Sequence, residues 1–271
     1  MNSQWFDVCQ NLGAWEIYRP ASTHVQTLIG NATGTGAWIG GASQQGSLSD
    51  HEPSYGGQGA TGGSELVNGI MDGSNDYIDL DQDNFSAVTE YASLGMTVCC
   101  AVKTDQSGSV YWGLPGMSNK TNGVGFRWKA SDGTYNIQAR DSGNTKYLDA
   151  KCTNTTLNNG QTHTVVATSN NASGTPVATV YVDGVSQTIS YTTQTSHAGF
   201  VAGSFSWQIG ANGVANNKFP GKMSHVAVWA KVLTEAEAQQ VHRAIMGGRR
   251  ISRVSSGSRP MGRRQVPRLD G

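Results

Sequence analysis

The feature that most constrains the fold is a series of short alternating segments between residues 66 and 230, separated by turn signals. The linkers SDGT, DSGN, NNGQ and VDGV combine Gly with Asn or Asp, which accept the positive φ angles of hairpin turns. Short segments at close intervals predict the strands of an antiparallel β-sandwich. The expected strands are 66–70, 76–80, 95–103, 109–113, 123–129, 134–140, 145–150, 162–169, 177–183, 186–191, 206–210 and 222–230.

Length and composition favour one large sandwich domain. The chain has 271 residues, and sandwiches of this size commonly form single domains. Charged residues make up only 14%, which suits many short strands better than helical packing. No repeat of fixed period appears, which argues against a propeller or a solenoid.

One helix is predicted after the last strand. Thr234 followed by Glu237 is a capping box, helix-forming residues continue through Ile245, and Gly247 and Gly248 provide a stop. The division predicted from the sequence is a glycine-rich extended arm over 1–65, a sandwich over 66–246 and a basic tail over 247–271.

The formal net charge of zero conceals an asymmetry. Residues 249–271 contain seven Arg and one acid, or +6, which leaves 12 basic and 18 acidic residues, or −6, for the rest. Such a tail is either solvated or bound to nucleic acid, an acidic lipid surface or an acidic protein groove. Without aromatic residues between the arginines, sequence-specific nucleic-acid binding is not expected. The candidate partner-binding residues are Arg249, Arg250, Arg253, Arg259, Arg263, Arg264 and Arg268.

The cysteines predict buried free thiols. Cys99 and Cys100 are adjacent and do not easily bridge each other, and their spacing from Cys9 and Cys152 fits no zinc motif. No apolar run reaches the length of a membrane span, and the N-terminus shows no export signal. We therefore expect a chain that folds in a reducing cytoplasm.

Three stretches carry a family resemblance: MDGSNDYIDL at 71–80, ATVYVDGVSQTISY at 178–191 and FPGKMSHVAVWAKVLTEAEAQQVHRA at 219–244. In order and spacing they resemble the laminin G-like branch of the concanavalin A-like lectin/glucanase jelly rolls. The resemblance implies an all-β, antiparallel jelly-roll sandwich with one short C-terminal helix, flanked here by N- and C-terminal arms. Its members serve adhesion, glycan binding or assembly, and one fold hosts many functions.

Two positions match the family's residues at the hairpin. His163 matches the histidine that opens the strand before the hairpin, whereas Thr162 replaces the family's usual Trp. Asp183 and Gly184 match the hairpin signature itself. Both His163 and Asp183 are expected to serve the structure, with a ligand contact at His163 as the alternative.

A calcium site is the main cofactor question, because sandwiches of this family often hold Ca²⁺ at one rim. The chain otherwise requires no cofactor. Carboxylate oxygens suit Ca²⁺, although this stretch is not an EF-hand and Asp72 also reads as a turn residue. The candidate metal ligands are Asp72, Asp76, Asp79 and Asp81, with Asp83 next to them.

Aromatic residues on expected strands provide the candidate sugar-binding surface, with core packing as the alternative for each. These residues are Trp112, Trp128, Tyr135 and Tyr147.

The chain is not expected to be an enzyme. Jelly-roll glucanases use two carboxylates in a Glu-x-Asp-x-x-Glu pattern, which is absent. The four glutamates before the helix, Glu16, Glu52, Glu65 and Glu90, do not pair, and no G-x-S-x-G elbow is present.

Three functional hypotheses follow. The first is a non-enzymatic structural or decoration subunit of a large assembly such as a virion, bound to neighbouring subunits and exposed on the particle surface after cytoplasmic folding. The second is a carbohydrate-binding or adhesion module, in a calcium-dependent form or without calcium. The third is a glycoside hydrolase.

Overall fold

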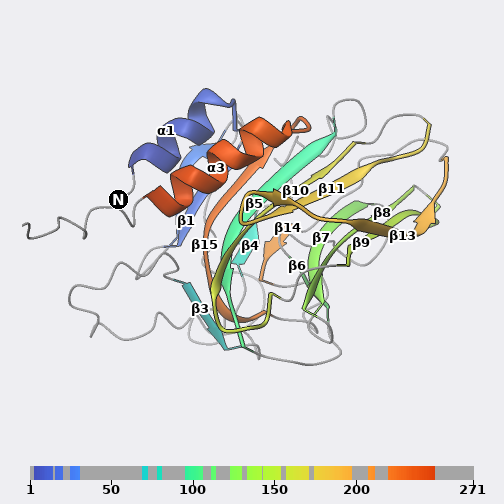
Figure 1. Cartoon of the computed structure of the whole chain (residues 1–271), viewed down its shortest axis with the longest axis horizontal. Helices are drawn as coiled ribbons and strands as arrows, with labels where there is room; N and C mark the ends of the chain where they lie inside the picture. Colours follow the sequence, from blue (N-terminus) through green and yellow to red (C-terminus); the bar gives the residue numbers. More distant parts are fainter. Residues whose placement is uncertain are drawn as a thin grey trace, which may run out of the picture.

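The structure is a computed structural model (Figure 1). It describes residues 3–14, 16–20, 25–30, 69–72, 78–80, 95–105, 111–113, 123–129, 133–141, 143–153, 157–170, 174–196, 207–210 and 219–247, apart from single positions within these ranges at which the side chain is not described.

The described residues form two helices and fifteen strands. The helices are α1 (Ser3–Asn11) and α3 (Glu235–Gly247). The strands are β1 (Glu16–Pro20), β2 (Val25–Gly30), β3 (Gly69–Asp72), β4 (Ile78–Leu80), β5 (Met96–Lys103), β6 (Tyr111–Gly113), β7 (Gly123–Lys129), β8 (Thr134–Arg140), β9 (Lys146–Cys152), β10 (Thr162–Ser169), β11 (Ala178–Val182), β12 (Val185–Ser186), β13 (Ile189–Gln194), β14 (Trp207–Ile209) and β15 (Pro220–Trp229).

Two antiparallel sheets face each other, as the sequence predicted for a jelly-roll sandwich. The eight-stranded sheet has the order β12-β11-β10-β5-β15-β1-β2, with β3 also paired to β15. The five-stranded sheet has the order β13-β9-β8-β7-β6, and β14 pairs with β4 separately. Figure 1 shows α1 and α3 side by side on the outer side of the eight-stranded sheet.

The turn chemistry confirms why the strands lie where the sequence placed them. At the hairpin between β11 and β12, Asp183 and Gly184 have φ angles of 52° and 79°, the positive values of a tight hairpin turn. Between β8 and β9, the Asp141 carboxylate accepts bonds from the backbone N–H groups of Gly143 and Thr145 at 3.0 and 2.8 Å. One expected strand, 186–191, is split in the structure between β12 and β13.

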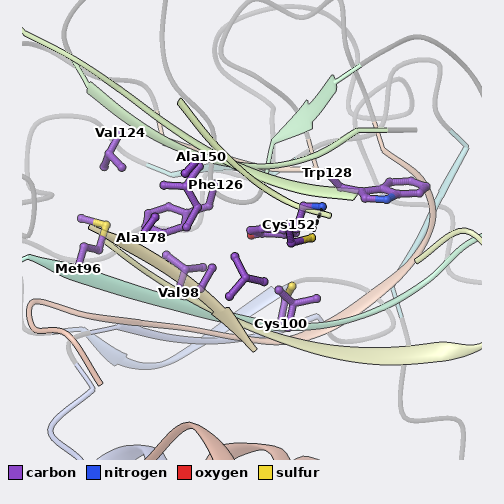
Figure 2. Packing of buried hydrophobic residues seen from close by; sticks show 14 of the residues in the cluster. Met96, Val98, Cys100, Val124, Phe126, Trp128, Ala150, Cys152 and Ala178 are labelled. Atoms are coloured by element: carbon purple, nitrogen blue, oxygen red, sulfur yellow. Dashed lines mark hydrogen bonds between the residues drawn. The ribbon is translucent and has the colours of Figure 1, made fainter. Parts of the chain in front are cut away.

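The main hydrophobic core lies between the two sheets. Figure 2 shows Met96, Val98 and Cys100 of β5 facing Phe126 and other buried side chains of the opposite sheet. A second core lies between the eight-stranded sheet and the two helices. Because β5 is covered on both faces, seven of its eight residues are buried.

The two cores explain the adjacent cysteines. Successive side chains of a strand point to opposite faces, so Cys100 joins the core between the sheets and Cys99 joins the core beneath the helices. All four cysteines are free and buried, which confirms the expected buried thiols. Burial is the largest cause that raises the pKa of the thiols of Cys9 and Cys100, which makes both poor nucleophiles.

The N-terminal region differs from the extended arm expected over 1–65. Residues 3–11 form α1, and β1 and β2 extend the eight-stranded sheet, with Ile17 paired to Ala227 of β15. A helix of nine residues is too short for an unambiguous helical period, and β1 joins the sheet by pairing with β15 from the other end of the chain as well as with β2. Residues 31–68 lie outside the described part of the chain.

Helix α1 lies against an irregular point in β15. The register between β15 and β5 shifts between Ser224 and Ala227, and His225 has a φ of 55°. The His225 carbonyl accepts a hydrogen bond from the Cys99 thiol at 3.3 Å, and the His225 ring meets Trp5 edge to face at 4.8 Å. A β-bulge therefore aims His225 toward the N-terminal helix.

The capping box predicted for α3 is present. The Thr234 N–H donates to Glu237 Oε2 at 2.7 Å, and the Glu237 N–H donates to Thr234 Oγ1 at 3.3 Å. Among the described residues, neither helix has the length and apolar character that crossing a membrane requires.

Candidate functional site

The outer face of the five-stranded sheet is the candidate functional site. The inner residues of β8 are Tyr135, Ile137 and Ala139, which leaves Asn136, Gln138 and Arg140 on the outer face. Strand pairing then fixes three rows across the sheet, because paired residues share a face. The rows are Arg127, Asn136, Lys151 and Ser190; then Gly125, Gln138, Asp149 and Thr193; then Gly123, Arg140 and Lys146.

Asp149 is the centre of a hydrogen-bond network on this face. Asn136 donates to Asp149 Oδ1 at 2.8 Å and to the Ala150 carbonyl at 2.9 Å. Gln138 donates to Asp149 Oδ2 at 3.3 Å, and Lys146 Nζ lies 2.7 Å from the same oxygen. The Arg127 guanidinium in turn donates to Gln138 Oε1. The network holds two amides, a carboxylate and two cations in fixed orientations.

The network keeps Asp149 ionised. Burial raises the pKa of this carboxyl, but hydrogen bonds from Lys146, Asn136 and Gln138 and the charge of Lys146 outweigh burial, so the pKa lies below its ordinary value. A carboxylate held in its charged form accepts hydrogen bonds well and is a poor proton donor at neutral pH.

Four cations share the three rows with this carboxylate. Arg127, Arg140, Lys146 and Lys151 are all partly exposed, and Asn136 and Gln138 between them are only 4% and 8% exposed. Arg140 also donates to the Asn144 carbonyl at 2.8 Å, which ties it to the turn between β8 and β9. Among the described residues of the three rows, positive groups outnumber the one carboxylate.

Three of the four aromatic candidates for a sugar-binding surface lie in the interior instead. Trp128, Tyr135 and Tyr147 are 1–2% exposed and belong to the core between the sheets. A side chain buried to this extent has no face left for a sugar, so the core-packing alternative describes all three. Trp112 pairs with Trp128 in the strand register, and its side chain lies outside the described part.

The calcium candidates are placed only in part. Asp72 ends β3 beside Pro220 of β15, and Asp79 lies in β4 opposite Gln208 of β14, while Asp76 and Asp81 lie outside the described residues. Within the part of the chain that the structure describes, no three His, Cys, Asp or Glu side chains gather as metal ligands would. The calcium site stays a prediction. The arginines of the basic tail also lie outside the described residues.

The two family-matched residues of the hairpin form a separate polar cluster. His163 Nδ1 lies 2.7 Å from Asp183 Oδ2, and the Thr164 N–H donates to Asp183 Oδ1 at 2.9 Å. Thr164 Oγ1 shares a 2.6 Å hydrogen bond with His242 Nδ1 of α3. Gly184 is required beside this helix, since an added Cβ would lie 2.9 Å from the His242 ring.

This hairpin cluster holds α3 against β10 and the β11–β12 turn. Burial raises the pKa of Asp183, but hydrogen bonds from His163 and the Thr164 backbone outweigh burial, so the pKa is lowered. Thr164 is 1% exposed, which leaves its hydroxyl no access to a substrate. The expected structural role therefore describes both His163 and Asp183 in this geometry.

The sequence reasoning missed the residues of the outer face. The signal was present, because TYNIQAR at 134–140 alternates between large inner residues and polar outer ones. The alternation predicts the strand, but the sequence-based hypothesis assigns the ligand surface to the side of Tyr135, which the structure places in the core. Cross-strand partners such as Asp149 and Lys151 become visible only through the strand pairing.

Comparisons with known proteins agree with this architecture. A crystal structure of a mutant of HCR/D matches with 12% identity and a TM-score of 0.54, over 86% of this chain and 51% of that chain. The receptor-binding domain of a botulinum neurotoxin C/D mosaic serotype matches with 12% identity and a TM-score of 0.47, over 65% of this chain and 44% of that chain. A Trypanosoma rangeli sialidase matches with 14% identity and a TM-score of 0.45, over 64% of this chain and 26% of that chain.

The chain thus spans about half of the HCR/D structure and less of the other two. At 12% identity the likeness to the HCR/D structure shows a shared fold and no activity. No curated protein matches the sequence significantly. The model of one family does match, over residues 72–239, which is more than half of the chain. The chain belongs to this family, the laminin G-type concanavalin A-like lectin/glucanases superfamily.

Proposed function

We propose that the chain is a non-enzymatic structural or decoration subunit that displays its laminin G-like sandwich on a large assembly, such as a virus particle. The observation that carries the non-enzymatic part is the state of the carboxylates. Among the described carboxyl groups, those with a shifted pKa are Asp149, Asp183 and Glu237, and in each of them hydrogen bonds outweigh burial and lower the pKa. A glycoside hydrolase instead needs one carboxyl with a raised pKa as its general acid.

Attachment to the assembly is supported by the division of charge. The tail of residues 249–271 carries +6 and the rest of the chain −6. A basic tail suits an acidic groove of a neighbouring subunit.

The test removes the charge of the tail from the full chain. Replacing its seven Arg by Gln should leave the sandwich folded and abolish incorporation into the native particle, measured by sedimentation of particles with bound subunit. A matched variant with seven Lys keeps the charge and should retain incorporation. Incorporation of the Gln variant at the native level would remove the support for a tail tether.

Catalysis is tested directly on the purified protein. Release of reducing sugar from β-glucans, above the level of a heat-unfolded sample, would overturn the non-enzymatic proposal.

A second candidate function, glycan binding, is favoured by the outer face of the five-stranded sheet. A partly exposed carboxylate and partly exposed cations, held in place by the nearly buried amides of Asn136 and Gln138, are groups that bind sugar hydroxyls without reorganising. A polysaccharide pull-down with and without a calcium chelator tests this function. No retention in either condition would count against it.

A further inference from the structure

We propose that the outer face of the five-stranded sheet binds an acidic polysaccharide, one that carries carboxylate or sulfate groups along its chain. The inference rests on the glycan-binding candidate function and names the class of glycan. Its basis is the placement of Arg127, Arg140, Lys146 and Lys151 on a single sheet face.

The charge of this face is opposite to that of the body. Residues 1–248 carry a net charge of −6, yet the three described rows contain four cations and one carboxylate. The carboxylate of Asp149 is engaged by Lys146, Asn136 and Gln138 at 2.7–3.3 Å. Its charge is therefore largely compensated within the network, and the remaining charge of the described residues in these rows is positive.

The spacing of the cations suits a linear polyanion. Arg127 and Lys151 stand on either side of Asn136 in one row, two strands apart. Neighbouring strands are separated by about 4.8 Å, so these two backbone positions lie about 10 Å from each other. Arg140 and Lys146 stand together in another row of the same face. A chain laid across the strands would meet a cation at more than one point.

The exposed groups of the rows suit a glycan better than a bare anion. Asn136 and Gln138 are only 4% and 8% exposed, so their amides hold the network in place, while Ser190 and the partly exposed cations reach solvent. Hydroxyls and partly exposed cations together bind the hydroxyl and anionic groups of acidic sugars. The apolar residues of these strands face the interior, which disfavours an apolar ligand here.

The experiment uses the full chain with the seven tail arginines changed to Gln, so that the tail does not bind the polyanion itself. Binding is measured by calorimetry to heparin, to polygalacturonate, to uncharged dextran and to poly-glutamate. The test variant combines Lys146→Gln with Lys151→Gln, and a second variant combines Lys146→Arg with Lys151→Arg. The matched control combines Lys103→Gln with Arg243→Gln, two cations away from the face.

We expect heparin and polygalacturonate to bind and dextran to give no signal. The Gln pair should weaken binding by about tenfold or more, because each lost contact is a charge-assisted hydrogen bond. The Arg pair keeps both positive charges, and the control pair lies away from the face. Both should therefore stay within about twofold of the parent, whereas the loss of one charge-assisted contact is worth roughly tenfold. Binding should also weaken in 1 M salt, where charges are screened beyond about 3 Å. Thermal unfolding checks that each variant is folded.

Each other outcome overturns the inference. Dextran binding equal to heparin binding would show a neutral-glycan site and leave the glycan-binding function standing. Poly-glutamate binding as tight as heparin, with the same response to the variants, would assign the face to an acidic protein. Absence of binding to every glycan, with all variants folded, would remove both the inference and the glycan-binding function beneath it.

Discussion

The two outer faces of this sandwich differ in composition, because one is apolar and covered by helices and the other is polar and hydrogen-bonded across its strands. The outer face of the eight-stranded sheet carries apolar residues such as Ala101, Val166 and Trp229, and it lies under α1 and α3. The outer face of the five-stranded sheet carries Asn136 and Asp149 in a network of cross-strand hydrogen bonds.

The difference follows from how each face avoids the cost of exposure. An apolar face must be covered, because each exposed apolar Å² forfeits about 25 cal/mol. A polar face can stay near water if its groups satisfy one another, and it then keeps charge available for a ligand. The helices therefore belong to the stability of the molecule, and the polar face is the one that we propose for ligand binding.

The largest effect is expected on the covered face. Trp5 of α1 is 4% exposed and packs edge to face on His225. Replacing Trp5 by Ala should lower the free energy of unfolding by about 3–5 kcal/mol, because the cavity is only partly refilled. Denaturant unfolding measures this loss, with Val185→Ala as the control at a side chain 62% exposed. A loss no larger than that of the control would mean that α1 is not part of the folded core.

A smaller effect is expected on the polar face. Asn136→Ala removes bonds of 2.8 and 2.9 Å to Asp149 and to the Ala150 carbonyl at a site 4% exposed. The expected loss is about 1–3 kcal/mol, the cost of leaving a buried polar group unsatisfied. Chemical unfolding beside Ser190→Ala, a change at an exposed position of the same row, measures the difference. A loss exceeding that of Trp5→Ala would reverse the contrast between the faces.

The smallest expected effect is a difference in how the stability of the two faces depends on pH. Burial lowers the pKa of His242 below the ordinary 6.5, with a contribution from Arg243 that Asp183 opposes. Below a pH of about 6.5 the unfolded chain then binds more protons than the folded one. The contribution of His242 to stability is therefore lost as the pH falls toward 5. Asp149 has a lowered pKa, so its contribution persists until the pH falls below the ordinary 3.8.

Replacing His242 by Asn tests this separation. In this variant the loss of stability between pH 7 and pH 5 should be smaller than in the parent chain. The difference should be measurable but below about 1 kcal/mol, as for a single partly exposed interaction. Unfolding in denaturant at both pH values gives the comparison, and Asp149→Asn should leave that interval unchanged. An unchanged pH dependence in His242→Asn would assign the titration to another group.

Most of the fold could be predicted from local sequence. Turn residues such as Asp183 and Gly184 must take positive φ wherever they lie, and Thr234 with Glu237 caps a helix through contacts three residues apart. These signals act over a few residues and survive without knowledge of the partners. The N-terminal strand β1 carries no comparable turn or cap signal, and its place between β2 and β15 depends on a strand far along the chain.

Only part of the candidate site could be predicted from the sequence. The alternation in 134–140 indicates two faces, but it does not say which face is buried. Trp128 and Tyr135 are suitable for stacking on a sugar and also for filling a core, and the second use prevailed because the other sheet covers them. Asp149 lies 13 residues from Asn136 in the chain, so their bond depends on register.

The sequence by itself determined most strands after residue 66, their turns, the capped helix and the opposite charges of tail and body, because each depends on neighbouring residues or on a sum over them. Only the tertiary structure decided which side of each strand meets water, that α1 joins the core, and that four cations share one face. Those features require strands far apart in the chain to pair in one register, which local residue preferences do not specify.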